Sequence, residues 1–271
     1  MIVAPLFREN VPPEYSWIEV NYYEMARERG YMLDTLAEYL IFANHLFEND
    51  IRKNTVCLKN SLAYDRTLVY KDVPYEVAEK LYAKDPGKLT EDEKIQLMDF
   101  MFHWIIKKSI EIQMPIQIHT GYFAGNGRNL ANGNPIQLTN LFIQYPEARF
   151  ILFHGGYPWT REWVALGKMF PNVYLDLCWL AQISRQTAVS TLDDVLDCVP
   201  YNKIFWGGDA TLIEEATGAL EVTKDVVAEV LTDRIQRGVM DEDMADNVAQ
   251  AIFRGNAIRV FNLKRKVSNK F

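Results

Sequence analysis

The stretch "MPIQIHTG", Met114–Gly121, is a short apolar run that ends on a histidine and then breaks at a glycine. Two other stretches have the same form: "RFILFHGG", Arg149–Gly156, ends on a histidine, and "KIFWGGDA", Lys203–Ala210, ends on an aspartate. Short apolar runs bounded by glycine are typical of buried parallel strands. One such histidine could be a core residue held by hydrogen bonds. Three runs that each end on a group able to bind a metal ion need a common explanation.

Helical segments separate these runs along the chain. The spacing of apolar residues predicts helices over 33–50, 74–85, 90–113, 135–145, 159–169, 190–198, 214–237 and 241–261. Asp34 is a candidate N-cap, and Thr90 with Glu93 has the pattern of a capping box. Each helix is therefore expected to have its own start signal or apolar face.

Further buried strands are expected in "TVCLK" (55–59), "NVYLDLCW" (172–179) and "IVAPLF" (2–7). Strands that alternate with helices predict an α/β fold with a parallel sheet and right-handed crossovers. The length of each strand–helix unit suits a (β/α)8 TIM-barrel-like sheet with long loops. We expect one domain over residues 1–271.

Four side chains lie at or just beyond the carboxyl ends of the expected strands: Lys59, His119, His154 and Asp209. The carboxyl ends of parallel strands meet at one face of a barrel, where the chemistry of such folds is found. Neutral imidazole and carboxylate groups that converge on one point are typical metal ligands. The sequence therefore predicts a metal site at this face.

At these residues the sequence resembles the amidohydrolase-related (amidohydrolase 2) family of metal-dependent TIM-barrel hydrolases. The matching stretches are "VCLKNSLAYDRTL", "MPIQIHTGYFAGNGRNLANGNPIQL", "RFILFHGGYPWTREWVALGKMFPNVYLDLCWL", "KIFWGGDAT" and "RGNAIRVF". In that family the ligands are an HxH pair on strand 1, a Lys or Glu on strand 4, His on strands 5 and 6, and Asp on strand 8. The resemblance assigns Lys59 to strand 4, His119 to strand 5, His154 to strand 6 and Asp209 to strand 8.

The resemblance also implies cofactors and a reaction. It implies a divalent metal, with zinc first and manganese or iron as alternatives, and a carbamylated Lys59 that would bridge two ions. The expected function is a metal-dependent hydrolase in which metal-activated water attacks an amide, ester or other C–N bond of a small molecule. Asp209 would be the catalytic general base. An isomerase or decarboxylase on the same scaffold, or a non-catalytic remnant or fragment of such an enzyme, are the alternatives.

The sequence departs from the family pattern at its start. The chain has four histidines and no HxH, and His45 and His103 lie inside expected helices, where we interpret them as structural. If residues 2–7 form strand 3, strands 1 and 2 are absent. We therefore expect an incomplete barrel of about strands 3–8, N-terminally truncated relative to the family. The chain would be either a shortened protein or a fragment of a longer enzyme.

Other polar residues near the expected strand ends are candidates for substrate binding: Tyr64, Arg66, Tyr122, Arg128 and Arg161. Asp176 either supports the metal ligands or binds local backbone donors. Cys57 and Cys178 lie in apolar runs and are interpreted as small core residues. With no GxSxG and no evident Cys–His arrangement, a serine or cysteine nucleophile is not expected.

Composition limits the remaining function classes. The chain of 271 residues is 49% hydrophobic and carries a net charge of -7, which argues against a nucleic-acid partner. No apolar run approaches the length of a membrane span, and three scattered cysteines favour a reducing, cytoplasmic location. Because an incomplete barrel exposes apolar strand edges, we expect a homo-oligomer in which a second copy covers an edge.

Overall fold

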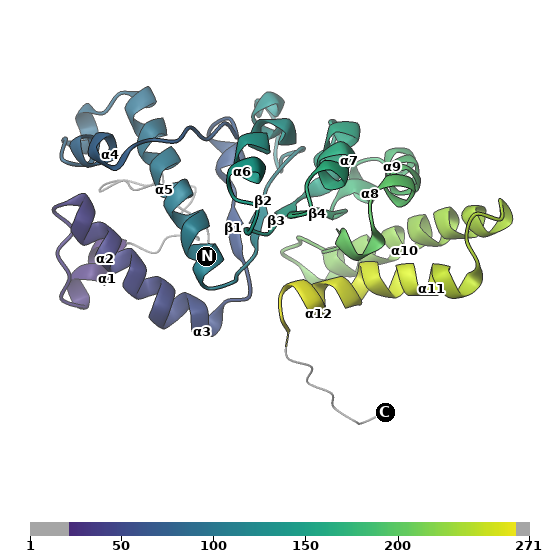
Figure 1. Ribbon diagram of the computed structural model, residues 1–271. Coiled ribbons are helices and arrows are strands. Elements are labelled where there is room, and N and C mark those ends of the chain that lie inside the picture. Colours follow the sequence, from purple (N-terminus) through teal and green to yellow (C-terminus); the bar gives the residue numbers. More distant parts are fainter. Residues whose placement is uncertain (1–21, 264–271) are drawn as a thin grey trace.

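The computed structural model describes residues 22–263, apart from the side chains of Tyr22, Tyr23 and Asn54, and has a single five-stranded parallel sheet at its centre (Figure 1). The strands follow one another in chain order, β1-β2-β3-β4-β5. Their bounds are β1 Leu58–Asn60, β2 Ile116–Ile118, β3 Phe150–Leu152, β4 Val173–Asp176 and β5 Ile204–Phe205. The register pairs Leu58 with Ile116, Ile116 with Phe150, Phe150 with Val173, and Leu175 with Ile204.

The strand order identifies the type of α/β fold. In a doubly wound sheet the order reverses at a switch point, whereas in a barrel each new strand is added on the same side. Here five strands are added in one direction without reversal, so the sheet is an arc of a (β/α) barrel. The fold class predicted from the sequence is confirmed. The expected strand at residues 2–7 lies outside the described residues.

The helices flank this arc. Helices α1–α5 gather beyond the β1 end of the sheet, and α10–α12 gather at the β5 end (Figure 1). The bounds are α1 Tyr22–Glu28, α2 Leu36–Leu46, α3 Arg52–Asn54, α4 Tyr75–Tyr82, α5 Glu91–Glu111, α6 Thr139–Gln144, α7 Thr160–Met169, α8 Leu180–Ile183, α9 Arg185–Cys198, α10 Ile213–Gln236, α11 Glu242–Gln250 and α12 Asn256–Val260. Single π-helical turns at Phe47–Ile51 and Ala251–Gly255 extend α2 and α11.

Two helix starts show how local sequence sets the boundaries. The capping box predicted at Thr90 and Glu93 begins α5 as expected. The N-cap of helix α2 is Thr35, one residue after the predicted N-cap Asp34. Glu38 donates its N–H to the Thr35 hydroxyl, and its carboxylate accepts the N–H of Thr35, so a second T-x-x-E box decides the start.

The outer edge of β5 is covered by the closing helices. The side-chain amide of Asn256 donates to the carbonyls of Ile204, at 2.7 Å, and Tyr201, at 2.8 Å. The N–H of Trp206 donates to the carbonyl of Ile252 at 3.2 Å. The chain's own π-helical turn and α12 therefore bond to β5 at this edge. The oligomeric state itself stays a prediction.

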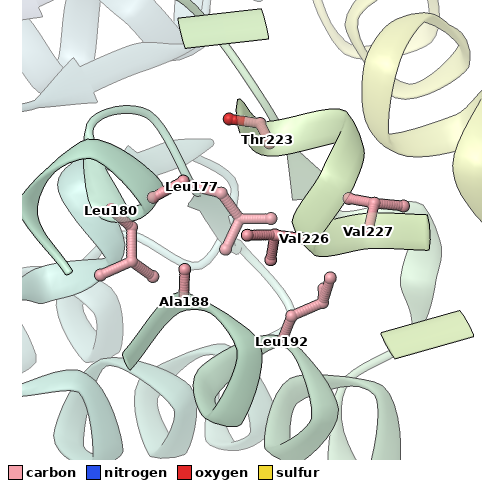
Figure 2. A pocket seen from close by; sticks show the side chains of 8 residues that line it. Leu177, Leu180, Ala188, Leu192, Thr223, Val226 and Val227 are labelled. Carbon is pink, nitrogen blue, oxygen red and sulfur yellow. The ribbon is translucent and has the colours of Figure 1, made fainter. Parts of the chain in front are cut away.

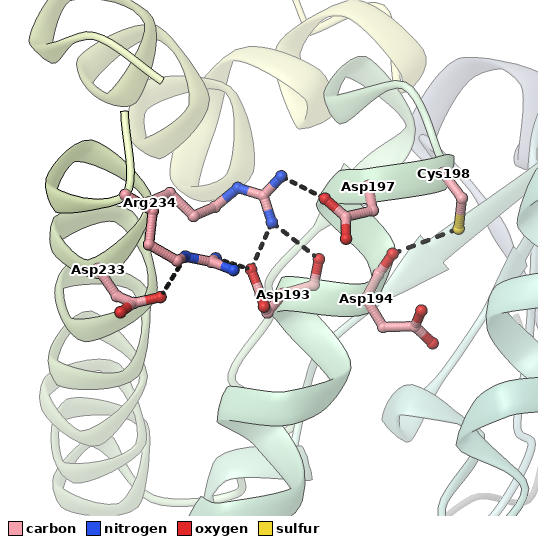
Figure 3. Close-up of polar contacts among 7 residues, drawn as sticks. Asp193, Asp194, Asp197, Cys198, Asp233 and Arg234 are labelled. Carbon is pink, nitrogen blue, oxygen red and sulfur yellow. Dashed lines mark hydrogen bonds and ion pairs between the residues drawn. The ribbon is translucent and has the colours of Figure 1, made fainter. Parts of the chain in front are cut away.

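Helices α9 and α10 are joined by ion pairs (Figure 3). The guanidinium of Arg234, which is only 7% exposed, donates to the carboxylates of Asp193 and Asp197, and Arg237 donates to Asp193 at 2.8 Å. These bonds tie α9 to the second half of α10. Within residues 22–263, no helix has both the length and the apolar composition that crossing a membrane requires.

Candidate metal centre

His119 and His154 lie next to each other beyond the carboxyl ends of neighbouring strands. His119 directly follows β2, and His154 is separated from β3 by one residue. Nδ1 of His119 lies 3.1 Å from Nε2 of His154, and the ring centroids are 4.4 Å apart. The register of β2 and β3 ends with Ile118 opposite Leu152, and the left-handed backbone of His154, with φ of 63°, belongs to the turn after β3.

Asp209 completes a three-residue cluster. One of its carboxylate oxygens, Oδ2, lies 3.6 Å from Nε2 of His154, and the side chain is 36% exposed. The indole N–H of Trp179 donates to the backbone carbonyl of Asp209 at 2.9 Å and so helps to position the loop after β5. The cluster is thus closed below by the two buried imidazoles and open to solvent at the carboxylate.

Three non-glycine residues of this region have a left-handed backbone. The φ angles are 63° at His154, 62° at Trp179 and 41° at Asp209. Such conformations cost about 1–3 kcal/mol each and are found preferentially at functional sites. Gly155 and Gly156, with φ of 56° and 61°, continue the turn that begins at His154. The backbone is therefore strained where the polar side chains converge.

Lys59, on β1, lies beneath the cluster. Its Nζ is 3.3 Å from the centroid of the Phe153 ring, and among the residues that the structure describes it has no hydrogen-bond partner. Burial lowers the pKa of this amine, and the negative charge of Asp209 opposes that shift. A buried amine without an acceptor is costly to keep charged.

Burial also sets the protonation of the two imidazoles. Desolvation, aided by the charge of Lys59, lowers the pKa of His119 to about 3. Desolvation followed by the proximity of His119 lowers the pKa of His154 well below its usual range. Both rings are therefore neutral near pH 7, the form in which imidazole binds metals.

Asp176, at the end of β4, supports the cluster from within the protein. Its Oδ1 accepts the backbone N–H of Cys178 at 3.0 Å, and burial raises its pKa to about 6. Of the two roles considered for this residue, the structure shows the bond to local backbone donors. Asp176 also interacts electrostatically with Lys59 and Asp209, so it lies close enough to affect them.

Cys178 is one of two residues of the site that were not predicted from the sequence. Its Sγ lies 3.2 Å from Nδ1 of His154, although "YLDLCW" indicated only a small core residue. The expectation that no Cys–His pair exists was wrong. Burial, with the charge of Asp176, raises the pKa of the thiol well above its usual value, so it remains a thiol and a poor nucleophile. Trp179 was missed too; it stacks on His154 with ring centroids 4.1 Å apart.

The five candidate substrate residues are placed differently. Tyr64 lies 4.6 Å from the His119 ring between centroids, and Arg128 lies over Tyr64 at 5.2 Å. The backbone carbonyl of Tyr122, rather than its phenol, contacts the site, since Nε2 of His119 lies 2.9 Å from it. Arg161 is an exposed residue of the first turn of α7.

Arg66 does not join this group. Its guanidinium is buried and pairs with Asp99 of α5 at 2.7 Å, and its other donors bind the carbonyls of Thr67, Val69 and Ile95. All of its donating groups face protein, so the structure gives it a role in tying the β1 loop to α5. His103 and His45 are structural as expected: Nδ1 of His103 lies 2.7 Å from the Tyr145 hydroxyl, and Nδ1 of His45 lies 3.1 Å from Nδ2 of Asn49.

A second hollow between α8, α9 and α10 is a packing gap. Figure 2 shows the side chains that line it, among them Leu177, Leu180, Leu192 and Val226. Its volume is about 10 Å³, which is room for about one water. The hydroxyl of Thr223 donates to the carbonyl of Ala219 at 2.7 Å, which leaves an apolar lining.

Comparison with known proteins agrees with the fold. The family model described as Amidohydrolase matches residues 101–263. Protein fluG of Emericella nidulans is 32% identical over 174 residues, which are 60% of this chain and 20% of that protein. The 2-keto-4-carboxy-3-hexenedioate hydratase of Sphingobium sp. is 28% identical over 190 residues, which are 61% of this chain and 51% of the hydratase. The chain thus spans a fifth and about half of these relatives.

Two solved structures share the fold at low sequence identity. A proposed metal-dependent hydrolase from Lactobacillus casei superposes with a TM-score of 0.74 at 21% identity, over 89% of this chain and 63% of that one. Uronate isomerase from Thermotoga maritima superposes with a TM-score of 0.75 at 17% identity, over 89% of this chain and 57% of the isomerase. These likenesses show a barrel-type fold for the described sheet.

Proposed function

Because this chain belongs to the amidohydrolase family, we propose that it is a metal-dependent hydrolase that holds a divalent ion between His119, His154 and Asp209. The proposed substrate is a small molecule with an amide, ester or other C–N bond. The observation that carries the proposal is the approach of two neutral imidazole nitrogens to 3.1 Å, with a carboxylate oxygen 3.6 Å from one of them.

Two of the three ligand separations are close to those around a shared ion. Two donors that each lie about 2.1 Å from one ion are roughly 3.0–3.4 Å apart. The distance of 3.1 Å between Nδ1 of His119 and Nε2 of His154 falls in this range. The distance of 3.6 Å between Oδ2 of Asp209 and Nε2 of His154 is slightly longer, and a small rotation of the carboxylate would bring it into the range. Two imidazoles and a carboxylate are also the ligand types that zinc, manganese and iron accept.

The chain's own hydrogen bonds prepare the ligands. The carbonyl of Tyr122 is an acceptor and requires Nε2 of His119 to carry the proton, which leaves the Nδ1 lone pair directed at the cluster. Trp179, stacked on His154, prevents that ring from turning. When bound, a divalent ion supplies Lewis acidity, since it lowers the pKa of coordinated water toward about 7 and polarises a substrate carbonyl.

Asp209 is the proposed proton carrier. Its carboxylate is the only partly exposed member of the three-residue cluster, so one oxygen can face the imidazoles while the other meets substrate and water. It would accept a proton from the attacking water and donate it to the leaving group. The Gly-rich loop after β2, with Tyr64 and Arg128 in contact beside His119, is the proposed substrate side of the site.

Lys59 is the proposed site of carbamylation. Its neutral amine would attack carbon dioxide, which forms one N–C bond, and one N–H proton would leave to solvent to give a carbamate anion. The product would be an anionic oxygen ligand beside the cluster, in place of a buried amine that has no acceptor within residues 22–263. This modification would supply the negative charge that two histidines and one aspartate provide only in part.

The test combines metal content with an isotope label. The purified chain, loaded with Zn²⁺, Mn²⁺ or Fe²⁺, is incubated with a panel of small amides and esters in H₂¹⁸O. We expect product that contains one ¹⁸O, dependence on the ion, and loss of both metal and activity in His119→Asn and Asp209→Asn. His45→Asn, on α2, is the matched control and should change neither.

Other outcomes identify the alternative functions. Product of the same mass as its substrate, formed without ¹⁸O in a new bond, would indicate an isomerase and overturn hydrolysis. Loss of carbon dioxide would indicate a decarboxylase. A chain that binds no divalent ion in any of these conditions would be non-catalytic, as the remnant hypothesis predicts, and would overturn the whole proposal.

A further inference from the structure

We propose that Cys178 is a positioning residue for His154: its thiol occupies Nδ1 of that imidazole, so that the ring presents Nε2 to the cluster and to any bound cation. The inference deepens the proposed function, and its consequence for metal binding rests on that function. The contact itself belongs to the metal-free protein and can be measured there.

The two ring nitrogens of His154 face different partners. Nδ1 lies 3.2 Å from Sγ of Cys178, whereas Nε2 lies 3.1 Å from Nδ1 of His119 and 3.6 Å from Asp209. Sγ, a His154 nitrogen and an Asp209 oxygen all lie within 4.8 Å of one another, so a shared ion could be imagined. The thiol, however, contacts Nδ1 of His154, whereas Asp209 faces Nε2. This arrangement favours a role in supporting His154 over a role as a third metal ligand.

Three hydrogen bonds link Tyr122, His119, His154 and Cys178, and the Tyr122 carbonyl fixes the direction of each. The Tyr122 carbonyl accepts the Nε2 proton of His119, so Nδ1 of His119 has only a lone pair. In the metal-free protein the 3.1 Å contact is then a bond in which Nε2–H of His154 donates to His119. With one proton per neutral ring, Nδ1 of His154 is an acceptor, and the S–H of Cys178 is the donor that meets it.

The same thiol can also bond to the tautomer of His154 that carries its proton on Nδ1. A cation between the imidazoles needs the lone pair of His154 Nε2, so that the ring proton must sit on Nδ1 and find an acceptor there. A thiol is a weak donor and also a weak acceptor, so Cys178 keeps its own proton and turns its sulfur lone pair to Nδ1–H. An aliphatic side chain at this position would remove the sulfur partner of Nδ1–H and leave only the Cys178 backbone near the ring, which disfavours the tautomer that binds metal.

The thiol is held rigidly enough to serve this purpose. Cys178 is fully buried, and its backbone N–H donates to Oδ1 of Asp176 at 3.0 Å. Trp179, the next residue, stacks on His154. Its ring lies against the imidazole at an interplanar angle of 18° and restricts rotation of the imidazole. The segment 176–179 therefore fixes both the position and the hydrogen bonding of one ring.

The test uses the small number of histidines. With ¹⁵N-histidine, four rings report their nitrogens by long-range ¹H–¹⁵N correlation, and His154→Asn identifies the relevant pair. In the metal-free protein, Cys178→Ala should move the His154 Nδ1 resonance toward that of a nitrogen without a hydrogen bond, and Cys178→Ser should restore it. Cys198→Ala is the matched control, because the Cys198 thiol also donates one weak bond, to the Asp194 carbonyl at 3.3 Å (Figure 3).

Metal titration gives the second readout. We expect Cys178→Ala to weaken Zn²⁺ binding by about 10–100-fold, the usual effect of removing a partner of a ligating histidine, with recovery in Cys178→Ser and no change in Cys198→Ala. Urea unfolding verifies that each variant is folded. An unchanged His154 Nδ1 resonance in Cys178→Ala, or unchanged Zn²⁺ affinity in a chain that binds Zn²⁺, would overturn the proposal. If the resonance moves but no form of the chain binds metal, the contact stands and the proposed function fails.

Discussion

Gly121 is the point at which the loop after β2 touches the turn that carries His154. Its φ is +76°, and a Cβ placed on it would lie 2.7 Å from the backbone of both Gly156 and Tyr157. The loop closes again on this residue at Gly133, whose own added Cβ would lie 2.3 Å from the carbonyl oxygen of Gly121. Backbone atoms cannot move aside as a flexible side chain can. Gly121→Ala should therefore be strongly destabilising.

The magnitude has two parts. A left-handed backbone costs a non-glycine residue about 1–2 kcal/mol, and overpacking against fixed atoms adds about 1–3 kcal/mol. Gly127 in the same loop has the same φ, +76°, and a Cβ there would meet nothing within 4 Å. Gly127→Ala is thus a matched control that has the cost of the left-handed backbone without the cost of overpacking. We expect losses in the free energy of unfolding of about 2–5 kcal/mol for Gly121→Ala and about 1–2 kcal/mol for Gly127→Ala.

Urea denaturation followed by circular dichroism measures both variants. The difference between them isolates the steric part, because the backbone angle is shared. Since His119 is two residues from Gly121 and His154 two residues from Gly156, Gly121→Ala should also weaken Zn²⁺ binding while Gly127→Ala should not. Equal destabilisation by the two substitutions would refute the close approach of the two loops.

The other predictions concern charge and metal. Arg234→Met should lower the free energy of unfolding by about 1–3 kcal/mol, since it removes the buried guanidinium that bonds to Asp197 and to Asp193 and leaves Asp193 with Arg237 alone; thermal unfolding that is unchanged would contradict this. Burial raises the pKa of Asp193, but bonds from Arg234 and Arg237 outweigh it and lower that pKa, so this stabilisation is present above the unfolded pKa of about 3.9 and is lost as pH falls through the folded pKa. The gap between wild type and Arg234→Met should therefore narrow in acid. Lys59→Met should raise stability by about 1–2 kcal/mol, because it removes a buried amine without an acceptor, and should abolish any ¹³C-carbamate signal formed from labelled bicarbonate; a signal that persists would place the carbamate elsewhere. Purified chain should hold less than one tightly bound ion, since only Lys59, His119, His154 and Asp209 are available from the family ligand set, and one or two tight ions by elemental analysis would contradict this.

Much of the described fold could be predicted from the sequence, because strand and helix periods differ and the strands are short apolar runs. The predicted boundaries shifted where pairing or capping decided them. The strand expected over 55–59 begins at Leu58, since that is the first residue to pair with β2. Strand β5 ends at Phe205, because the next N–H, of Trp206, turns to the π-helical turn before α12. The helix expected at 190–198 begins at Arg185, where Ser184 caps it.

The candidate site was predictable to the extent that it follows strand ends. His119, His154 and Asp209 converge because the register of a parallel sheet aligns the ends of its strands. Cys178 could not be found in this way, since it lies beyond the end of β4 and its contact with His154 is not set by the strand register. Arg66 was also beyond sequence reasoning, because its partner Asp99 lies on a helix that packs back over the loop after β1.

X-ray absorption at the zinc edge tests the central claim most directly. The claim is that His119, His154 and Asp209 of one chain share one divalent ion. Zn²⁺-loaded wild type should show two imidazole ligands with nitrogen at about 2.0–2.1 Å, and oxygen in the remaining positions. His119→Asn should show one imidazole fewer, and His45→Asn should leave the spectrum unchanged. A first shell of oxygen alone, or one that His119→Asn does not alter, would contradict the account.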